Sequence, residues 1–395
     1  MSKKLVIWGA GRFGKVAFYY FNEEYDTISY VDRNEEKWGK TMNGVTICNP
    51  DTFDFCDCDV VIASKYDSSQ ISAELREKGA KTITIFGVSI NSAQKKNDTH
   101  SNIEEGNGKK SIIHFSGGLG NQLFQYAFIK NVELANKTEI YGNISACKLP
   151  GSRDFCLNKV FKKLKISYVS DESEQEYIDD IFRNSSCSKF VYYKENMCRG
   201  IKKKADKSLL SAESGVFTGI FQSSYWADNI RRELLEELEF DHNKEKALSE
   251  LMEKIRCDDR AVSIHFRRGD YLNEMNTYYY GNICNSDYYN DAMKLVTQKK
   301  GEVRFYVFSD DIEFVKRNYS IPNATYVENN LFADYEDWYD MCLMSACKHN
   351  IIANSTFSWW GAWLNENPEK IVVAPKRWIN TYEYLDIYPK EWITI

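Results

Sequence analysis

The sequence predicts an α/β protein that folds as more than one domain. Short apolar runs typical of buried strands recur along the 395 residues, and several lead into a glycine loop followed by an amphipathic stretch. Alternation of strand and helix favours parallel sheets, because parallel strands need a crossover connection. A chain of this length can bury two or three separate cores.

The composition is that of a globular protein, with 43% hydrophobic and 27% charged residues. A formal net charge of −6 argues against nucleic acid as the main partner, so that local basic groups would have to hold any anionic ligand. Aromatic residues reach 14%, with 26 Tyr and 9 Trp. Such richness is typical of proteins that stack sugars on rings, although cores use the same residues.

The cysteines and the start of the chain predict a cytoplasmic protein. The 11 cysteines form no Cys-x-x-Cys pair, so we expect reduced thiols, no metal site and no disulfide framework. The first residues enter a strand too early for a signal peptide. No apolar run approaches the roughly 18 residues that a membrane span requires.

Residues 1–90 carry the pattern of a small, Rossmann-like α/β domain. A strand at 5–8 leads into a glycine run, a helix should follow to about residue 21, and a second strand occupies 27–31. Further elements are expected as strands at 59–63 and 82–86, with a helix at 69–78 between them.

The run Gly9-Ala10-Gly11-Arg12-Phe13-Gly14 matches the dinucleotide fingerprint G-x-G-x-x-G. Its first glycine would make the turn, its second would let the backbone approach a pyrophosphate, and its third would let the helix pack closely. Asp32 would then accept a hydrogen bond from a ribose hydroxyl. The alternative is that these glycines serve only a tight turn, so the ligand is at most an unidentified nucleotide. An oxidoreductase would also need a catalytic pair such as Tyr-x-x-x-Lys, and 15–90 contains none.

From 91 to 110 the chain turns polar and loses periodicity, which predicts a flexible linker. A second α/β unit begins with a strand at 111–115, the glycine loop 117–122, a helix, and a strand at 138–141. Farther on, residues 225–240 predict one amphipathic helix. The basic run Lys202-Lys203-Lys204 would be a solvated face or, alternatively, a contact with an anionic membrane surface.

Three apolar strands in the last third of the chain end in polar clusters. The strand at 261–266 ends in His265-Phe266-Arg267-Arg268-Gly269-Asp270, the strand at 304–308 ends in Ser309-Asp310-Asp311, and the strand at 350–353 leads into Asn354-Ser355-Thr356. A last strand is expected at 371–374. Because the carboxyl ends of parallel strands share one edge of a sheet, we expect the three clusters to line one crevice.

These clusters suit a nucleoside diphosphate. Arg267 and Arg268 can each grip phosphate oxygens with a planar fork that stays charged. Ser355 and Thr356, together with the N–H groups of the helix that follows, would cradle a phosphate.

The paired carboxylates that follow the second strand have two interpretations. Asp310 would accept from the N1–H and the exocyclic amine of a guanine, whereas Asp311 would cap the helix that starts at Ile312. Both carboxylates could also serve as helix caps. A metal at this pair is disfavoured, because the arginines already supply positive charge.

The clusters, together with two earlier segments, resemble the successive motifs of the bacterial α-1,2-fucosyltransferases of glycosyltransferase family 11. The similar segments are GGLGNQLFQY at 117–126, GIFQS at 219–223, HFRRGDY at 265–271, FSDD at 308–311 and NSTFSWWGAW at 354–363. The resemblance covers about 111–395 and does not extend to 1–90.

The resemblance implies a GT-B-like glycosyltransferase of two Rossmann-like halves, at 111–240 and 241–395. The second half would bind GDP-fucose, and the first would bind most of the acceptor. Transfer would be metal-independent, would invert the anomeric carbon, and would need no cofactor besides the donor. The product would carry fucose on a hydroxyl, expected to be O2, of a galactose-terminated glycan. That acceptor would be free or attached to a lipid carrier at the inner membrane face.

Within that scheme Arg267 or Arg268 would hold the β-phosphate and stabilise departing GDP. The general base stays open between Asp270 and Glu274, because Asp270 would alternatively orient an arginine and a dissociative transition state would need no strong base. The residues expected to contact the donor are His265, Asp310, Asn354, Ser355 and Thr356, with Asn121 or Gln122 reaching in from the facing half.

Two aromatic groups and the N-terminal domain complete the expectations. The spacing of Trp359, Trp360 and Trp363 favours the core over a sugar platform, whereas residues 278–280 are an acceptor-side candidate. The N-terminal domain would otherwise be a nucleotide sensor or an assembly module. The competing hypothesis for the whole chain is an NAD(P)-dependent or sensor domain fused to a glycan-binding protein or to a GDP-sugar transferase of other specificity.

Overall fold

The computed structural model describes residues 3–11, 14, 17–18, 21, 25–63, 68–85, 109–184, 190–195 and 202–395. The predicted linker, apart from its last two residues, and most of the helix expected after Gly14 lie outside these residues. The chain divides into two compact units, one of Met1–Lys110, Val169–Asn196 and Ala212–Thr218, the other of Ser111–Tyr168, Met197–Ser211 and Gly219–Ile395.

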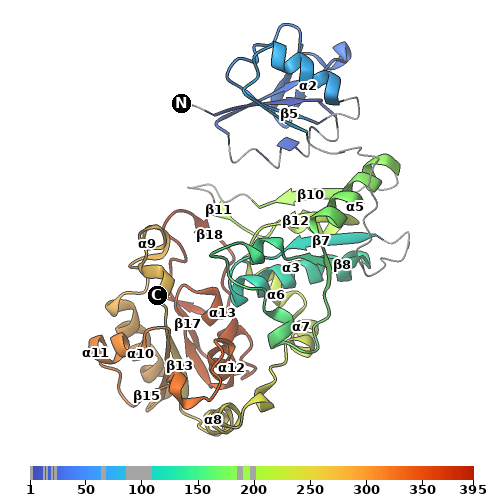
Figure 1. Ribbon diagram of the computed structural model, residues 1–395. Coiled ribbons are helices and arrows are strands. Elements are labelled where there is room, and N and C mark those ends of the chain that lie inside the picture. Colours follow the sequence, from blue (N-terminus) through green and yellow to red (C-terminus); the bar gives the residue numbers. More distant parts are fainter. Residues whose placement is uncertain are drawn as a thin grey trace. The chain divides into compact units, whose positions relative to one another are not determined.

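The N-terminal sheet has six strands in the order β3-β4-β2-β1-β5-β6. Its strand β5 is labelled in Figure 1. Its neighbouring strands are parallel except for the β3–β4 pair, which the sequence analysis missed. The other expected strands and helix α2 are confirmed. The elements are β1 (Lys4–Trp8), β2 (Thr27–Val31), the 3-10 turn η1 (Glu35–Lys37), β3 (Thr41–Met42), β4 (Val45–Cys48), β5 (Asp59–Ile62), α2 (Ser68–Glu77) and β6 (Thr82–Ile85).

The first unit also contains two segments from farther along the chain. The first includes α5 (Asp171–Asn184) and β10 (Phe190–Lys194), the second includes β12 (Ser214–Thr218), and β10 pairs with β12 in parallel. The sequence between 151 and 215 is only weakly periodic, so the sequence analysis did not foresee these elements.

The second unit opens with a strand, a long buried helix and a second strand. Helix α3 (Leu119–Asn136) is buried along most of its length, since its faces carry apolar residues almost all round. The elements of this part are β7 (Lys110–His114), β8 (Glu139–Asn143), η2 (Ser145–Lys148), α4 (Leu157–Val160), β9 (Ser167–Val169), β11 (Lys202–Lys203), η3 (Lys207–Ser211), α6 (Ser224–Asp228), α7 (Arg231–Glu237), η4 (His242–Lys244) and α8 (Lys246–Arg256).

The single helix predicted at 225–240 is wrong, because the structure breaks it into α6 and α7. The side-chain amide of Asn131 donates to the carbonyl oxygen of Trp226 at 2.7 Å, and Asn229 donates to the side-chain oxygen of Asn131 at 2.6 Å. A buried asparagine on α3 thus occupies a carbonyl that a continuous helix would use for its own ladder. Trp226, Ile230, Leu234 and Leu238 are nevertheless buried, as expected for the apolar face of an amphipathic segment.

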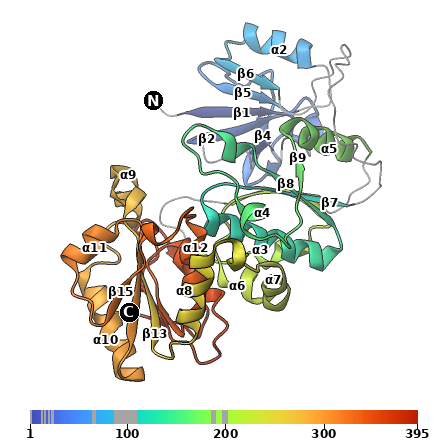
Figure 2. The ribbon, with the colours of Figure 1, turned by 60° about the horizontal axis from the view of Figure 1, so that its bottom comes forward.

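The C-terminal sheet has the order β15-β14-β13-β16-β17-β19, and its neighbouring strands are all parallel. In both ribbon views α10 and α11 lie on one side of this sheet and α8 and α12 on the other (Figures 1 and 2). The elements of this part of the chain are β13 (Ala261–Phe266), η5 (Gly269–Leu272), α9 (Glu274–Tyr280), α10 (Ser286–Lys300), β14 (Arg304–Ser309), α11 (Ile312–Asn318), β15 (Ala324–Tyr326), η6 (Asn329–Leu331), α12 (Trp338–Ala346), β16 (His349–Ile351), α13 (Thr356–Trp363), β17 (Val372–Ala374), β18 (Glu383–Tyr384) and β19 (Ile393–Thr394). Strand β18 pairs with β11 outside the C-terminal sheet.

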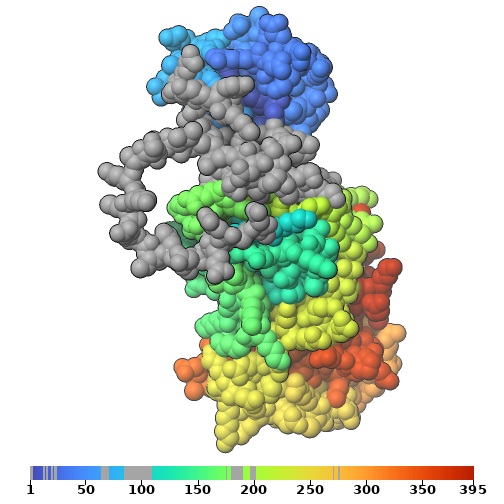
Figure 3. Space-filling model, turned by 90° about the vertical axis from the view of Figure 1, so that its right-hand side faces the viewer, coloured from blue at the N-terminus to red at the C-terminus, as the bar shows by residue number. Residues whose placement is uncertain are grey.

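The core of this sheet confirms the apolar readings of the sequence. Strand β13 is buried at every position, as a strand covered on both faces must be. Trp359, Trp360 and Trp363 are at most 1% exposed, which confirms them as core residues. Helix α8 buries Leu248, Met252 and Ile255 and exposes its charged residues. The yellow part of the chain, which includes α8, lies at the surface in Figure 3. Within the part of the chain that the structure describes, no helix combines the length and apolarity that a membrane crossing needs.

Candidate active site

The three polar strand ends come together at one edge of the C-terminal sheet. Strand β13 is flanked by β14 and β16, and the parallel register aligns His265 with Phe308 and Ile264 with Ile351. The clusters that follow these strands therefore leave the sheet side by side. This arrangement confirms that the three clusters share the carboxyl edge of the sheet, and the crevice between them stays a prediction.

The arginine loop after β13 is bound to the carboxylate after β14. Arg267 forms an ion pair with Asp310 at 2.9 Å, and the backbone N–H of Arg268 donates to the other oxygen of Asp310, also at 2.9 Å. A Cβ at Gly269 would lie 2.5 Å from the same carboxylate, so that a side chain at this position would push the loop away. Both oxygens of Asp310 therefore hold the arginine loop in place.

Arg268 faces helix α11. Its Nε donates to Asp311 at 3.2 Å, and its guanidinium carbon lies 3.1 Å from the centre of the Phe314 ring. Asp311 also accepts from the backbone N–H of Phe314 at 3.2 Å, which confirms it as the N-cap of α11. The two adjacent arginines thus differ in their surroundings.

The N-termini of α3 and α13 meet without side-chain caps. Neither Gly118 before α3 nor Ser355 before α13 caps its helix through a side chain. A Cβ at Gly120 would lie 2.6 Å from the Thr356 hydroxyl oxygen and 2.7 Å from the Phe357 nitrogen, whereas one at Gly118 would meet nothing within 4 Å. Uncapped N–H groups at two neighbouring helix starts favour an anion here.

We expect Gly120→Ala to separate these two helix starts and to lower the transferase activity implied by the sequence resemblance at least tenfold, because the added methyl overlaps backbone atoms of α13. The steady-state rate and the unfolding temperature would be measured together. Gly118→Ala is the matched control and should keep near wild-type activity, since open space surrounds it. Equal losses in both variants would contradict this reading of the contact.

Gln122 and Asn121 organise the glycine loop. Gln122 is 0% exposed, and its amide donates to the carbonyls of Gly117 and Asp154 at 2.8 and 2.9 Å while its oxygen accepts from the N–H of Cys156 at 2.9 Å. Asn121 accepts from Gln222 at 3.0 Å. Gln122 therefore has its polar groups engaged within the protein, and contact of either residue with a donor stays a prediction.

Gln222 is a site residue that the sequence analysis did not single out, although it lies in the segment 219–223. Its amide nitrogen donates to Asn121, and its oxygen accepts from the indole N–H of Trp378 at 3.0 Å. It thus joins the glycine loop to the segment after β17. Its position inside the motif at 219–223 could have identified Gln222 from the sequence.

Asn354 shapes the third strand end. Its amide donates to the carbonyls of Tyr280 and Trp378, each at 3.3 Å, and its backbone carbonyl accepts from the Tyr271 hydroxyl at 2.9 Å. These bonds tie the loop before α13 to the segment around α9. Direct contact of Asn354 with a donor stays a prediction, as it does for Ser355 and Thr356.

His265 is a neutral, buried imidazole next to the crevice. Burial, aided by the nearby charge of Arg267, lowers its pKa to about 3. Its ring centre lies 5.9 Å from that of Phe357 at the start of α13, and its Nδ1 has no hydrogen-bond partner. A buried imidazole with an open ring nitrogen has an unmet capacity for one hydrogen bond.

Asp340 is a second residue that the sequence analysis missed. It is 7% exposed, its Oδ1 has no partner, and burial raises its pKa to about 8 despite a hydrogen bond from Tyr335. The charges of Asp337 and Asp310 raise it further. The available signal was a lone carboxylate within the apolar run of α12, where a charge has no structural reason to be.

Two other predicted groups have a simpler outcome. The side chain of Asp270 lies outside the described atoms, so its role stays a prediction. In the basic run, Lys203 is 6% exposed with its amine beside Tyr382 and Tyr384, so the expectation of a solvated face is wrong for this residue.

In the N-terminal domain the glycine turn has the expected backbone features. Gly9 has a φ of 111°, and a Cβ at Gly14 would collide with the Gly9 carbonyl oxygen. Asp32 accepts from the N–H of Ala10 at 2.7 Å and from Lys37 at 2.8 Å. Burial opposes its ionisation, but these bonds prevail and lower its pKa. Binding of a nucleotide here stays a prediction.

The described residues contain no group of three or more His, Cys, Asp or Glu side chains that could hold a metal ion. The described cysteines are free thiols.

Comparison with known proteins places this site in a family. The model of glycosyltransferase family 11 matches residues 108–395, and a C2185-like N-terminal model matches 1–86. The chain is 29% identical over 303 residues to the O-antigen biosynthesis glycosyltransferase WbnK of Escherichia coli, covering 71% of this chain and 98% of that protein. It is 31% identical over 307 residues to an alpha-1,2-colitosyltransferase of Escherichia coli, covering 72% and 98%.

More distant similarity extends to an animal enzyme and to a solved structure. A galactoside alpha-(1,2)-fucosyltransferase 1 of Lagothrix lagotricha is 32% identical over 129 residues, which are 31% of this chain and 35% of that one. The fucosyltransferase NodZ from Bradyrhizobium aligns with a TM-score of 0.40 at 11% identity, over 65% of this chain and 93% of that one. A TM-score this low supports no conclusion about the fold.

The family model covers most of the chain, and the colitosyltransferase is matched almost end to end. This confirms the resemblance inferred from the five motifs. The chain therefore belongs to glycosyltransferase family 11 and carries in addition an N-terminal segment of the C2185-like type.

Proposed function

We propose that the protein transfers fucose from GDP-fucose to a hydroxyl, expected to be O2, of a galactose-terminated glycan. The observation that carries the proposal is the meeting of two uncapped helix N-termini, α3 and α13, at the edge where Arg267 leaves β13. Such a site favours a dianionic group, as the diphosphate of a GDP-sugar is. The names of the fucosyl- and colitosyltransferase relatives support a deoxysugar as the group transferred.

We further propose a GT-B architecture for 111–395, with a donor-binding half at 241–395, an acceptor-side half at 111–240 and a Rossmann-like domain at 1–90. Within it we assign the β-phosphate to Arg267. Each arginine pairs with one aspartate and lies near one ring, but the contact of Arg268 with Phe314, at 3.1 Å, is much closer than that of Arg267 with Tyr271, at 5.6 Å. A guanidinium oriented before the donor arrives loses little freedom when the phosphate binds.

In this mechanism the acceptor hydroxyl attacks the anomeric carbon from the face opposite the diphosphate, which inverts the configuration. Negative charge accumulates on the β-phosphate as the sugar–oxygen bond breaks, and Arg267 with the N–H groups of α13 stabilises that charge. The hydroxyl proton passes to a base, for which Asp270 and Glu274 are the candidates.

For the guanine we propose Asp340 in place of Asp310 as the acceptor of the N1–H and the exocyclic amine. Asp310 already accepts from Arg267 and from the backbone of Arg268. Asp340, by contrast, is buried with one oxygen unpartnered. Tyr335 bonds to this carboxyl, but a buried oxygen left without a partner is costly unless a ligand completes it. The open Nδ1 of His265 is a second polar group that a bound nucleotide would complete.

The experiment that tests the proposal measures GDP release from GDP-fucose with and without a β-galactoside acceptor, with and without EDTA. GDP-mannose, UDP-galactose and the GDP form of colitose would run alongside. Acceptor-dependent release from GDP-fucose that survives EDTA is the expected result. Faster release from the colitose donor would shift the assignment to that sugar, and release only from UDP-galactose would overturn it.

For residues 1–90 we propose nucleotide binding without redox chemistry. The pattern of strand, glycine turn and strand supports binding. The carboxylate of Asp32, which was expected to accept from a ribose hydroxyl, already accepts from Lys37 and from the N–H of Ala10, so the support comes from the turn alone. Titration of the full-length protein with NAD⁺, UDP and ADP, followed by tryptophan fluorescence, tests this. Binding that Gly11→Asp abolishes without altering GDP-fucose affinity is expected, and no binding of any nucleotide would leave the glycines a purely structural turn.

A further inference from the structure

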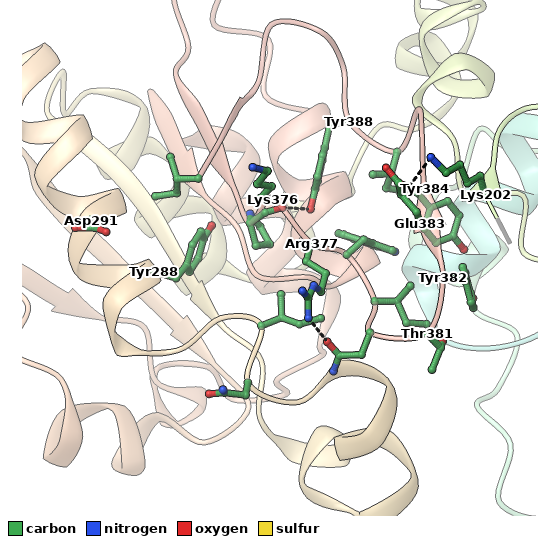
Figure 4. A pocket seen from close by; sticks show the side chains of 18 residues that line it. Lys202, Tyr288, Asp291, Lys376, Arg377, Thr381, Tyr382, Glu383, Tyr384 and Tyr388 are labelled. Atoms are coloured by element: carbon green, nitrogen blue, oxygen red, sulfur yellow. Dashed lines mark hydrogen bonds and ion pairs between the residues drawn. The ribbon is translucent and has the colours of Figure 1, made fainter. Parts of the chain in front are cut away.

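A pocket of about 860 Å³ opens where β17 ends. Figure 4 shows it, with Lys376 and Arg377 on the segment that follows β17 and the tyrosines of the β18 region across from them. In the sheet order β13-β16-β17 the pocket lies two strands from the arginine loop but at the same carboxyl edge. It is therefore distinct from the candidate diphosphate site and neighbours it.

Hydrogen bonds join the pocket to that site. Trp378, which lines the pocket, accepts at its carbonyl from Asn354 at 3.3 Å and donates from its indole to Gln222 at 3.0 Å. Gln222 in turn donates to Asn121 on the glycine loop at 3.0 Å. A ligand that extends from the reacting centre along the sheet edge would therefore reach the side of the pocket that Trp378 lines.

The wall formed by β18 is ordered before any ligand binds. Strand β18 pairs with β11, and the buried amine of Lys203 lies 5.1 Å from the ring centre of Tyr382 and 5.7 Å from that of Tyr384. Asp386 accepts from the N–H of Ala205 at 3.0 Å and from the Ser223 hydroxyl at 2.8 Å. Preordering of this kind reduces the entropy lost on binding.

The lining combines aromatic rings with cations. Trp378, Tyr382, Tyr384 and Tyr388 supply the flat apolar faces with polar edges on which sugar rings stack. Thr381 also lines the pocket, and its hydroxyl is buried without a hydrogen-bond partner.

The cations are not balanced by the carboxylates nearby. Lys202 pairs with Glu383 at 3.3 Å, but among the described residues no carboxylate pairs with Lys376 or Arg377, whose guanidinium reaches only Asn380 at 3.4 Å. Two adjacent open cations stand out in a protein with a net charge of −6. They favour an anionic group on the ligand.

We propose that this pocket binds the part of the acceptor behind the reacting sugar, and that this part carries an anionic group beside its sugar rings. The proposal rests on the proposed transferase function and specifies its acceptor. The anion would be the carboxylate of an acidic sugar or the diphosphate of a carrier-linked glycan, since both offer oxygens to Lys376 and Arg377.

The test compares three acceptors that share one galactosyl disaccharide: the neutral sugar, the same sugar with a uronic acid at its reducing end, and the same sugar with a diphosphate ester there. The variants are Lys376→Gln/Arg377→Gln and Tyr382→Leu. Lys299→Gln/Lys300→Gln, on the exposed end of α10, is the matched charge control. GDP-fucose affinity and the unfolding temperature would be measured for each.

We expect the wild-type KM to be about tenfold lower for at least one anionic acceptor than for the neutral one, and the Lys376/Arg377 variant to remove that difference. Tyr382→Leu should raise KM for all three acceptors by about tenfold through lost stacking. Donor affinity should stay unchanged. The anionic acceptor whose KM is lowered shows whether the pocket binds a sugar carboxylate or a diphosphate.

Equal KM values for neutral and anionic acceptors, or an unchanged preference in the Lys376/Arg377 variant, would overturn the proposal. If GDP-fucose binds but no acceptor is fucosylated, the proposed function fails separately. Calorimetric titration with the three sugars then decides the pocket. Anionic sugars that bind wild type and not the variant would support it, and sugars that do not bind at all would overturn it.

Discussion

Arg267→Ala should lower kcat/KM for fucosyl transfer by about 10³-fold, because it removes the cation assigned to the charge that develops on departing GDP. Arg267→Lys should recover little of this loss, since an ammonium keeps the charge but not the bidentate fork. The measurement is initial rate against donor concentration, with coupled detection of GDP. Most of the loss should lie in kcat, as for a contact that strengthens in the transition state.

Arg268→Ala is the matched comparison, because the two residues are adjacent and equally charged. Its side chain is directed to Asp311 and Phe314, so we expect less than about a tenfold loss, with a small decrease in the unfolding temperature. If Arg268→Ala proves the more damaging change while both proteins remain folded, the phosphate contact belongs to Arg268 and the assignment is reversed.

Asp340→Asn should weaken GDP binding about 100-fold. An amide cannot accept from both guanine N–H groups, and the variant also loses the charge that strengthens both hydrogen bonds. Inosine diphosphate lacks the exocyclic amine, so wild type should bind it more weakly than GDP. The variant should discriminate less between the two. Calorimetric titration of both nucleotides against both proteins measures this, and an unchanged GDP-to-IDP ratio would show that another residue reads the base.

The pKa of Asp340 gives this prediction a pH dependence. Burial raises the pKa to about 8 in the unliganded protein, whereas the carboxylate form is the one that accepts from guanine. GDP affinity should therefore increase with pH until about 8, and binding near neutral pH should release a proton. Titrations in two buffers of different ionisation enthalpy would detect that proton, and its absence would contradict the assignment.

The raised pKa of Asp340 also predicts that the folded protein loses stability as pH rises, while GDP binding improves. The folded-state pKa of Asp340 lies above the ordinary value of 3.8, so its favourable contribution is complete below about pH 4 and is lost as pH rises through about 8. Asp340→Asn stays neutral and should unfold at a higher temperature than wild type at pH 8, with the difference disappearing below about pH 4. A stabilised protein that binds donor poorly is the pattern expected of a functional buried charge.

Local pattern was enough to predict the three strand ends, the Asp311 cap and the tryptophan core. These features depend on residues near one another in sequence and on the rule that parallel strands expose their carboxyl ends at one edge. The five motifs were enough for the family. The class of donor was inferred from charge and residue type around Arg267 and Arg268, and it stays a prediction.

Tertiary structure decided the features that depend on distant partners. The break between α6 and α7 comes from Asn131 on another helix, and Lys203 is buried because β11 pairs with a strand about 180 residues later, at Glu383–Tyr384. The distinct surroundings of Arg267 and Arg268 and the open oxygen of Asp340 depend on packing in the same way. Sequence determines which groups are present, but only the folded contacts determine which of them are already satisfied and which remain available to a ligand.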